Sequence, residues 1–405
     1  TNKMSIKHLY PNSTPELNLN FKSSRVVDPR IVCSRTGDPA TYVDPVSGLI
    51  KTAPANVARV EEGGLLVEET RTNHAEYSVD FTNTQWYQYK VTPNLNAGTA
   101  PDGTNTAVKI VPTAENVNRS LLDTGVNATF SGSLTVSVYA KAAEYYVFKL
   151  TIDGASAGGA FGGSAVFDVS AGTVTQGTSG IGRIEALANG WYRCSVSHTN
   201  TAQSFAVWPG ISMYDNSGNS WFNANGTDGC LFWGFQLEES SFATSYIPTS
   251  GSTVQRLRDR IDVGIDNWWN DTEGTIVLEA DYSQTSNTMT LYTADLATGI
   301  KHRLRQEGAS IRYTMRSTGG STVFNFQQTA SPEKTAFGYA TDNLRFAYDG
   351  TLSSLDTSGT PPTGILYFRI GRDNNNSNPL LAGHIKRLSF YSTRASDTAL
   401  QSLTQ

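Results

Sequence analysis

The chain has 405 residues, which is enough for two or three domains that each bury a core. Its net charge of -5 argues against a nucleic-acid-binding surface, and a charged fraction of only 17% with 36 glycines is typical of all-β proteins with many turns. No apolar run approaches the roughly 18 residues of a membrane span, and we expect no signal peptide in the given sequence.

Residues 1–75 show little periodicity. Leu17, Leu19 and Phe21 alternate with asparagines and predict one short strand, and a second apolar run lies at 64–68. Such a segment cannot bury a sizeable core alone, so we expect an extended N-terminal segment that wraps a neighbour or docks onto a partner. The alternative is an arm packed against the next domain of its own chain.

Residues 76–255 form the first clear domain. Short apolar runs alternate with polar residues, and glycine-rich stretches at 154–164 and 177–182 are predicted loops between them. Short strands with turns between them predict a β-sandwich or jelly roll. The residues expected to point inward are Leu134, Val136, Val138, Ala140, Tyr146, Phe148, Leu150, Ile152, Tyr192, Cys194 and Val196.

The closing strand of this domain is predicted at 230–238. Under strict alternation Leu231, Trp233, Phe235 and Leu237 fall on one face, and this much aromatic area must be covered by a second layer. We therefore expect these four side chains to lie together in the core.

The segment that follows is charged. Its charges alternate in sign, so we expect salt bridges at the domain junction rather than an anion site. The residues are Arg256, Arg258, Asp259, Arg260 and Asp262.

Residues 262–405 predict a second sandwich that ends in a strand and a short helix capped by Ser396, with Ala399, Leu400 and Leu403 inward. The inward-facing residues of its strands are Ile276, Leu278, Ala280, Tyr282, Ile311, Tyr313, Met315, Leu344, Phe346, Tyr348, Leu366, Phe368 and Ile370. The predicted fold class is therefore all-β, with two antiparallel β-sandwich (jelly-roll or lectin-like) domains in series after the extended N-terminal segment.

The cysteines and histidines do not form a disulfide or metal pattern. The three cysteines, Cys33, Cys194 and Cys230, have no CxxC spacing, so we expect buried free thiols made in a reducing cytoplasm. The five histidines are scattered, and none stands at a metal-ligand spacing from a cysteine or another histidine.

Exposed aromatic rings beside polar side chains are the sequence's candidates for sugar binding, because the C–H face of a pyranose packs on a ring while its hydroxyls form hydrogen bonds. If Tyr192 and Cys194 point inward, Trp191 and Arg193 point outward. The alternative is that Trp191 packs under a loop or against another domain or subunit. Further candidates border the polar loop 215–229, namely Trp208, Tyr214 and Trp221.

Calcium is the metal alternative that the sequence leaves open. Two stretches rich in side-chain oxygens lack the spacing of an EF-hand loop, and asparagine and aspartate are also the usual turn residues. We therefore expect turns without a metal, and no cofactor. The residues are Asp215, Asn216, Asn219, Asn225 and Asp228 in the first stretch, and Asp373, Asn374, Asn375 and Asn376 in the second.

Three stretches resemble segments of a modular family of bacteriophage virion proteins. They are residues 41–86, SVYAKA (137–142) followed by NGWYRCSVS (189–197), and LFWGFQLEESSFATSYIPTSG (231–251). In that family such segments frame a carbohydrate-binding-like sandwich in fibres, spikes and other appendages. More loosely, residues 382–403 resemble the end of a concanavalin A-like or laminin-G-like sandwich.

The resemblance implies a virion structural protein, a head or tail fibre or spike on the virion surface that is assembled in the host cytoplasm. Its N-terminal segment would attach to other virion proteins, and its sandwiches would bind host-surface glycans and no nucleic acid. A homo-oligomer, a trimer by the precedent of fibres and spikes, is expected. The alternative is a purely architectural capsid decoration or connector without sugar binding.

A polysaccharide depolymerase is a third hypothesis. Glycosidases use two carboxylates about 5–10 Å apart, and Glu279 and Asp281 share one strand face. Glucanases with this type of fold carry a third acidic residue in alternation, where this chain has Ser283. Because the outer face of an antiparallel sheet is polar in any case, we expect no enzyme.

Overall fold

The computed structural model describes residues 14–24, 27–37, 40–123, 126, 130–156, 159–177, 179–265, 267–281, 288–297, 299–373 and 383–405. Within these ranges the regular structure is β-strand apart from a short 3-10 turn and one α-helix, α1 (Asp397–Thr404), so the all-β prediction is confirmed. No helix in this part of the chain is long and apolar enough to cross a membrane.

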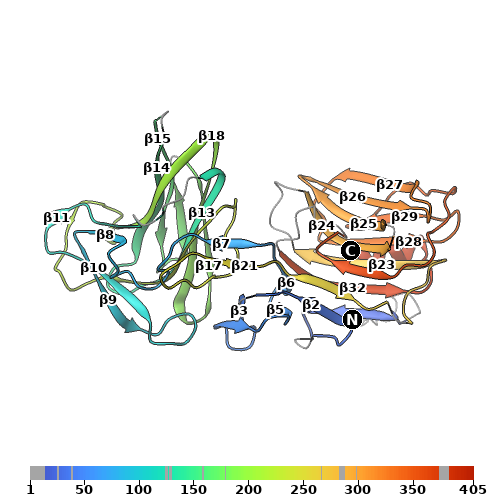
Figure 1. The fold of residues 1–405 in the computed structure, drawn as a ribbon, viewed down its shortest axis with the longest axis horizontal. Coiled ribbons are helices and arrows are strands. Elements are labelled where there is room, and N and C mark those ends of the chain that lie inside the picture. The colour runs from blue at the N-terminus through green and yellow to red at the C-terminus, as the bar shows by residue number, and fades with distance from the viewer. Residues whose placement is uncertain are drawn as a thin grey trace, which may run out of the picture. The chain divides into compact units, whose positions relative to one another are not determined.

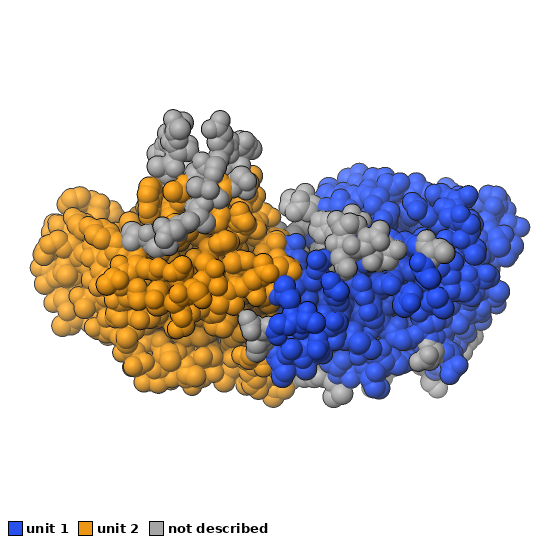
Figure 2. All heavy atoms as spheres, viewed as in Figure 1, with its two compact units in different colours: residues 1–38, 53–69, 257–405 blue, residues 39–52, 70–256 orange. Residues whose placement is uncertain are grey.

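The chain divides into two compact units (Figure 2). Unit 1 is built from residues 1–38, 53–69 and 257–405, and unit 2 from residues 39–52 and 70–256. These divisions differ from the predicted ones, because the chain before residue 75 contributes to both units and does not form a segment apart.

Unit 2 is a sandwich in which one long strand, β18 (Trp191–Met213), takes part in both layers (Figure 1). We call the layers after β13 and β14. The β13 layer contains β9 (Val91–Gly98), β10 (Ala107–Pro112), β20 (Cys230–Glu238), β13 (Phe130–Lys141), the first part of β18 and β17 (Ile181–Ala186). The β14 layer contains β8 (Trp86–Tyr89), β12 (Ser120–Asp123), the last part of β18, β14 (Val147–Ser156), β15 (Gly159–Asp168) and β16 (Thr173–Gln176).

Both layers of unit 2 bury the side chains that alternation predicts. Tyr146 and Tyr192 are only partly buried at the edge of this core. The confirmed core residues are Leu134, Val136, Val138, Ala140, Phe148, Leu150, Ile152, Cys194 and Val196.

The glycine-rich stretch 154–164 is not a loop as predicted, since its described residues belong to the antiparallel pair β14–β15. A Cβ added to Gly163 would lie 2.7 Å from the Cβ of His198, and one on Gly162 would lie 2.9 Å from the carbonyl oxygen of Ile152. These glycines therefore permit close strand packing rather than a turn.

A bulge in β20 overturns the predicted alternation of the closing strand. Gly234 has a φ of 65°, and the pairing with β13 shifts register between Ser137 and Tyr139. As a result Phe232 and Phe235 both face the main core, whereas Trp233 faces the opposite side of the layer. A bulge inserts one residue into the strand, so every side chain beyond it changes face.

Three short strand pairs complete unit 2 and its connections. They are β3 (Ala40–Val43) with β4 (Ile50–Ala53), β7 (Arg71–Asn73) with β21 (Val254–Arg256), and β11 (Asn116–Val117) with β19 (Phe222–Asn223).

Unit 1 is a second sandwich, whose layers we call after β23 and β25 (Figure 1). The β23 layer contains β30 (Thr351–Leu352), β29 (Arg345–Tyr348), β28 (Lys334–Tyr339), β23 (Gly274–Asp281), β32 (Gly383–Tyr391), β6 (Gly64–Val67), β5 (Arg59–Glu61) and β1 (Leu17–Asn20). The β25 layer contains β2 (Ile31–Ser34), β22 (Arg260–Val263), β31 (Tyr367–Ile370), β24 (Thr288–Leu296), β25 (Gly299–Glu307), β26 (Ser310–Arg316) and β27 (Thr322–Thr329).

The core of unit 1 confirms most of the predicted inward residues. Tyr348 is partly buried, Leu366 is exposed just before β31, and Tyr282 lies outside the described residues. The confirmed ones are Ile276, Leu278, Ala280, Ile311, Tyr313, Met315, Leu344, Phe346, Phe368 and Ile370.

The N-terminal strands pair with strands from the far end of the chain. β1 pairs with β32, β2 with β22, and β6 with β32. The described part of residues 1–75 is therefore not an extended segment. It packs on its own chain, but mostly with the C-terminal residues 257–405 and not, as the alternative had it, with the next domain. Each of these strands is only four residues long. Local periodicity cannot indicate partners so distant in sequence.

The C-terminal helix and the cysteines agree with the prediction. The Ser396 side chain accepts a hydrogen bond from the backbone N–H of Ala399 at 3.2 Å, and Leu400 and Leu403 are buried. All three cysteines are free and buried, and burial raises the pKa of the Cys33 thiol to about 11.

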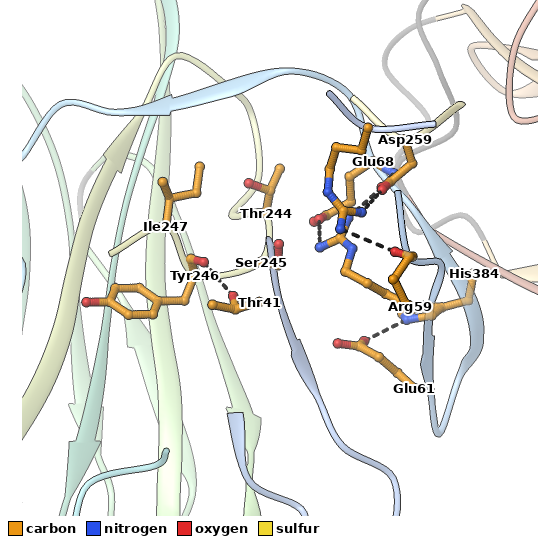
Figure 3. Close-up of polar contacts among 12 residues, drawn as sticks. Thr41, Arg59, Glu61, Glu68, Thr244, Ser245, Tyr246, Ile247, Asp259 and His384 are labelled. Atoms are coloured by element: carbon orange, nitrogen blue, oxygen red, sulfur yellow. Dashed lines mark hydrogen bonds and ion pairs between the residues drawn. The ribbon is translucent and has the colours of Figure 1, made fainter. Parts of the chain in front are cut away.

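A buried ion-pair network lies inside unit 1 (Figure 3). The Asp259 carboxylate accepts from Arg35 at 2.6 Å and from Arg59 at 2.5 Å, and the backbone N–H of Glu68 donates to it at 2.9 Å. Arg59 also pairs with the Glu68 carboxylate at 2.8 Å. Burial alone would lower the pKa of Arg59, but the charges of Glu68 and Asp259 raise it. Asp259 thus forms salt bridges, but inside unit 1 and not at a domain junction as predicted, and its partners are N-terminal arginines rather than Arg258 or Arg260.

We predict that Asp259→Asn lowers the free energy of unfolding of unit 1 by about 3–5 kcal/mol, because it leaves two buried guanidinium groups with one carboxylate fewer. Asp281→Asn is the matched control, since Asp281 is exposed at the end of β23 and should cost less than about 1 kcal/mol. Hydrogen exchange in increasing urea, read separately for peptides of each unit, measures both. Equal effects of the two substitutions would contradict the prediction.

Candidate functional site

The outer face of the β13 layer is covered by the chain itself. Trp191 is 1% exposed, and its Nε1 donates to the carbonyl oxygen of Thr99 at 3.1 Å. The expectation of an exposed Trp191 is therefore wrong, and the alternative that it packs under a loop is correct. It belongs to a cluster with Ile50, Ala100, Ala107, Tyr139, Trp233 and Tyr246.

Hydrogen bonds fix the covering segments on this face. The Thr41 hydroxyl donates to the carbonyl oxygen of Tyr246 at 2.5 Å (Figure 3), and the backbone N–H of Ile50 donates to that of Pro101 at 3.0 Å. Arg193 is half-buried beside them, with its guanidinium 5.4 Å from the centre of the Tyr139 ring. This side of unit 2 is therefore occupied by packing.

The outer face of the β14 layer carries exposed aromatic residues instead. Tyr87 is 53% exposed, Tyr89 41% and Trp208 39%. On β18 the buried Val207 and Ile211 face the core, so Trp208 stands on the opposite side. We call this surface the open face.

The strand register places these aromatics on one surface. One row of paired residues crosses four strands. It runs from Tyr87 on β8 through Leu122 on β12 and Gly210 on β18 to Thr151 on β14. Trp208 stands two residues before Gly210 on the same strand. With strands about 4.8 Å apart and a rise of about 3.4 Å per residue, Trp208 lies on the order of 12 Å from Tyr87.

The two tyrosines form a platform at the edge of this surface. Their rings are 6.3 Å apart and inclined by only 18°. Between them and Trp208 the surface is apolar, since Leu122 leans over Gly210. A Cβ on Gly210 would lie 2.6 Å from the Leu122 side chain. Flat rings at both ends of an apolar floor match the C–H face of a short sugar chain.

Polar side chains adjoin the aromatic ones. Ser120, Ser212 and Lys149 form one row of paired residues on the strands next to Tyr89. The Thr151 hydroxyl donates to the exposed Asp153 carboxylate at 2.8 Å. Asp153 lies opposite Trp208, so the free acceptor oxygen of the carboxylate lies within reach of a ligand hydroxyl beside that ring.

The other predicted sugar-binding residues lie elsewhere. Tyr214 follows the end of β18 and is half-buried, and its burial raises the pKa of its phenol. Trp221 is 61% exposed in the polar loop, next to the buried Phe222. Of the five predicted residues, the register places only Trp208 among the open-face aromatics. Tyr87 and Tyr89 were missed, although the run WYQY alternates one buried tryptophan with outward rings.

The oxygens of the loop 215–229 act as turn acceptors. Asp215 accepts from the backbone N–H groups of Ser217 and Asn219, and Asn225 accepts from those of Thr227 and Asp228. Across the described ranges no three His, Cys, Asp or Glu side chains gather as metal ligands. In the second stretch, Asn374, Asn375 and Asn376 lie outside the described residues.

The two carboxylates considered for catalysis lie on the outer face of β23, as predicted. Glu279 stands opposite Lys334 and Arg387, and Asp281 is exposed with its Oδ2 4.0 Å from Lys386 Nζ. Both are thus next to cations of neighbouring strands. Ser283, the position of a third acidic residue, lies outside the described residues.

No protein-family model and no curated protein matches this chain. Among solved structures it is similar to the CBM40 of the Ruminococcus gnavus IT-sialidase bound to alpha2,3 sialyllactose, with 17% identity over 34% of this chain and 84% of that chain and a TM-score of 0.30. It is also similar to the receptor binding domain of botulinum neurotoxin C/D mosaic serotype, with 10% identity over 36% and 39% and a TM-score of 0.30. These likenesses are too weak to assign a function.

We predict opposite roles for two tryptophans of β18. Trp191→Ala should lower the free energy of unfolding of unit 2 by about 3–5 kcal/mol, because it empties a buried aromatic cluster. Trp208→Ala should change it by less than about 1 kcal/mol, because much of this ring is in solvent. Urea unfolding of the two variants, followed by hydrogen exchange of unit 2, compares them directly. A larger loss for Trp208→Ala would contradict this assignment.

Proposed function

We propose that unit 2 binds glycans through the open face, with Tyr87, Tyr89 and Trp208 as the rings on which sugars pack. The observation that carries the proposal is the contrast between the two outer faces of one sandwich. On the β13 layer the aromatic residues are buried by the chain's own segments, whereas on the β14 layer they remain exposed. An exposed aromatic surface flanked by hydroxyl and carboxylate groups fits a saccharide better than a second packing interface.

The setting that we propose is a bacteriophage virion appendage, a fibre or spike that presents many copies of unit 2 to glycans of the host surface. The support is the resemblance of residues 41–86, 137–142, 189–197 and 231–251 to such proteins. Weak binding at each site gains strength when several copies engage one cell, so a homotrimer suits this role. Attachment to other virion proteins through the N-terminal residues belongs to the same proposal.

Binding to a panel of purified bacterial surface polysaccharides tests the glycan proposal. For a polysaccharide that binds, Trp208→Ala should weaken binding about twofold to thirteenfold, as the loss of about 0.5–1.5 kcal/mol of ring contact implies. Tyr87→Ala should act in the same direction, and the double variant should lose more than either.

Trp221→Ala is the control, because Trp221 is an exposed tryptophan in a separate loop. Loss of binding with Trp221→Ala and none with Trp208→Ala would overturn the open-face assignment. Absence of binding to every polysaccharide by a multimeric form would favour the architectural role. New reducing ends in the bound polysaccharide would favour a depolymerase.

A further inference from the structure

The outer face of the β25–β26 ladder in unit 1 concentrates positive charge. In β25 the buried His302 and Leu304 face the core, so the residues that alternate with them lie on the outer face. In β26 the residues that alternate with the buried Tyr313 and Met315 lie on the same outer face. Cross-strand pairing sets Arg303 opposite Thr314, Arg305 opposite Arg312 and Glu307 opposite Ser310, and the same register sets Lys301 opposite Arg316.

The charges on this surface do not balance. On the strands β25 and β26 themselves, the five cations Lys301, Arg303, Arg305, Arg312 and Arg316 stand against one anion, Glu307, which leaves a net charge of +4 (5 minus 1). The whole chain carries -5. Like charges directly opposite each other in a sheet cost about 0.2–1 kcal/mol per pair. We call these six residues the basic face.

Only part of this charge is used within the protein. Glu307 pairs with Arg305 and, at 3.6 Å, with Arg312, and Lys301 donates to the carbonyl oxygen of Thr318 at 2.8 Å. Arg316 is exposed, and the carboxylates of Asp373 and Glu307 affect Arg303 through their charges and not through a hydrogen bond. Burial, followed by the nearby charges of Arg305 and Arg316, lowers the pKa of the half-buried Arg303.

Two other arginines near this layer form ion pairs with carboxylates of the fold. Arg369 on β31 pairs with the buried Asp295, and Arg372 pairs with Asp262 at 2.5 Å. Arg369 also lies 3.8 Å from Asp262, so two carboxylates pair with these two guanidinium groups. On the basic face, the carboxylates of Asp373 and Glu307 act on Arg303 through charge–charge interactions, and the direct ion pairs of Glu307 go to Arg305 and Arg312. A carboxylate in direct contact therefore does not account for Arg303 or Arg316.

The surroundings supply hydrogen-bonding groups rather than aromatic rings. Thr314 lies between Arg303 and Asn325 in the ladder, and Arg312 Nε donates to the Asn325 side chain at 3.1 Å. Gln327 on β27 lies opposite Arg312 and is exposed. Amides and hydroxyls bind the hydroxyl groups of sugars, and guanidinium groups bind carboxylates through two parallel hydrogen bonds.

We propose that the basic face is a second binding site, specific for an acidic polysaccharide whose carboxylates meet Arg303 and Arg316. The rise along β25 and the spacing to β26 put neighbouring cations about 5–7 Å apart, which suits a chain of sugars with recurring carboxylates. The site is independent of the open face of unit 2, which has its own aromatic platform. Nucleic acid fits less well, since none of the outward residues of this ladder is an aromatic platform on which bases stack.

Binding of polygalacturonate to the full chain tests the proposal. The double variant Arg303→Gln/Arg316→Gln should weaken binding at least roughly tenfold, because it removes two charged hydrogen-bond donors. Arg303→Lys/Arg316→Lys keeps the charge and loses the paired donors, so it should fall between the wild type and the glutamine variant. Thermal unfolding of each variant checks that unit 1 is folded.

Two controls separate this site from general electrostatics and from the open face. Lys22→Gln/Lys334→Gln removes the same charge from unit 1 outside the basic face, and Trp208→Ala alters only the open face. Neither should change polygalacturonate binding. An equal loss with the lysine control, tighter binding of double-stranded DNA than of polygalacturonate, or no binding of polygalacturonate at all would overturn the proposal, whatever the outcome at the open face.

Discussion

The buried carboxylate of Asp259 is the constraint on which unit 1 depends. It accepts from Arg35 and Arg59 and from the backbone N–H of Glu68, so one side chain of the long C-terminal segment meets both N-terminal segments of the unit. Two arginines and two carboxylates make the network neutral, which permits its burial. The residues of unit 2 separate these segments in the sequence. The strands β1, β2 and β6 therefore depend on the C-terminal strands β22 and β32 to complete their sheets.

In unit 2 the corresponding constraint is that segments of the chain itself cover the outer face of the β13 layer. The cluster beneath this cover includes Ile50, Tyr139, Trp191, Trp233 and Tyr246. Alternation placed Trp191 on the outer face of its strand, but it could not show that other segments cover this face. The rings of Tyr87 and Tyr89 stay exposed on the other layer.

Local alternation predicted most core residues of both sandwiches, because a strand buried on one face must alternate whatever its partners are. It failed at Gly234, where a bulge moves Phe232 to the core side and Trp233 to the other. It also could not indicate the pairing of β1 with β32, or that Asp259 pairs with Arg35 and not with the adjacent arginines. Bulges and long-range pairs arise from tertiary packing, which leaves no periodic trace.

The most direct test of the central claim follows the indole N–H resonances of the seven tryptophans by NMR during titration with a polysaccharide fragment that binds. The exposed Trp208 should shift in proportion to occupancy, while Trp191 and Trp233, which donate to Thr99 and Thr106 inside the covered face, should stay in place. Shifts confined to Trp221, or binding without any shift of Trp208, would contradict an open face that holds the sugar.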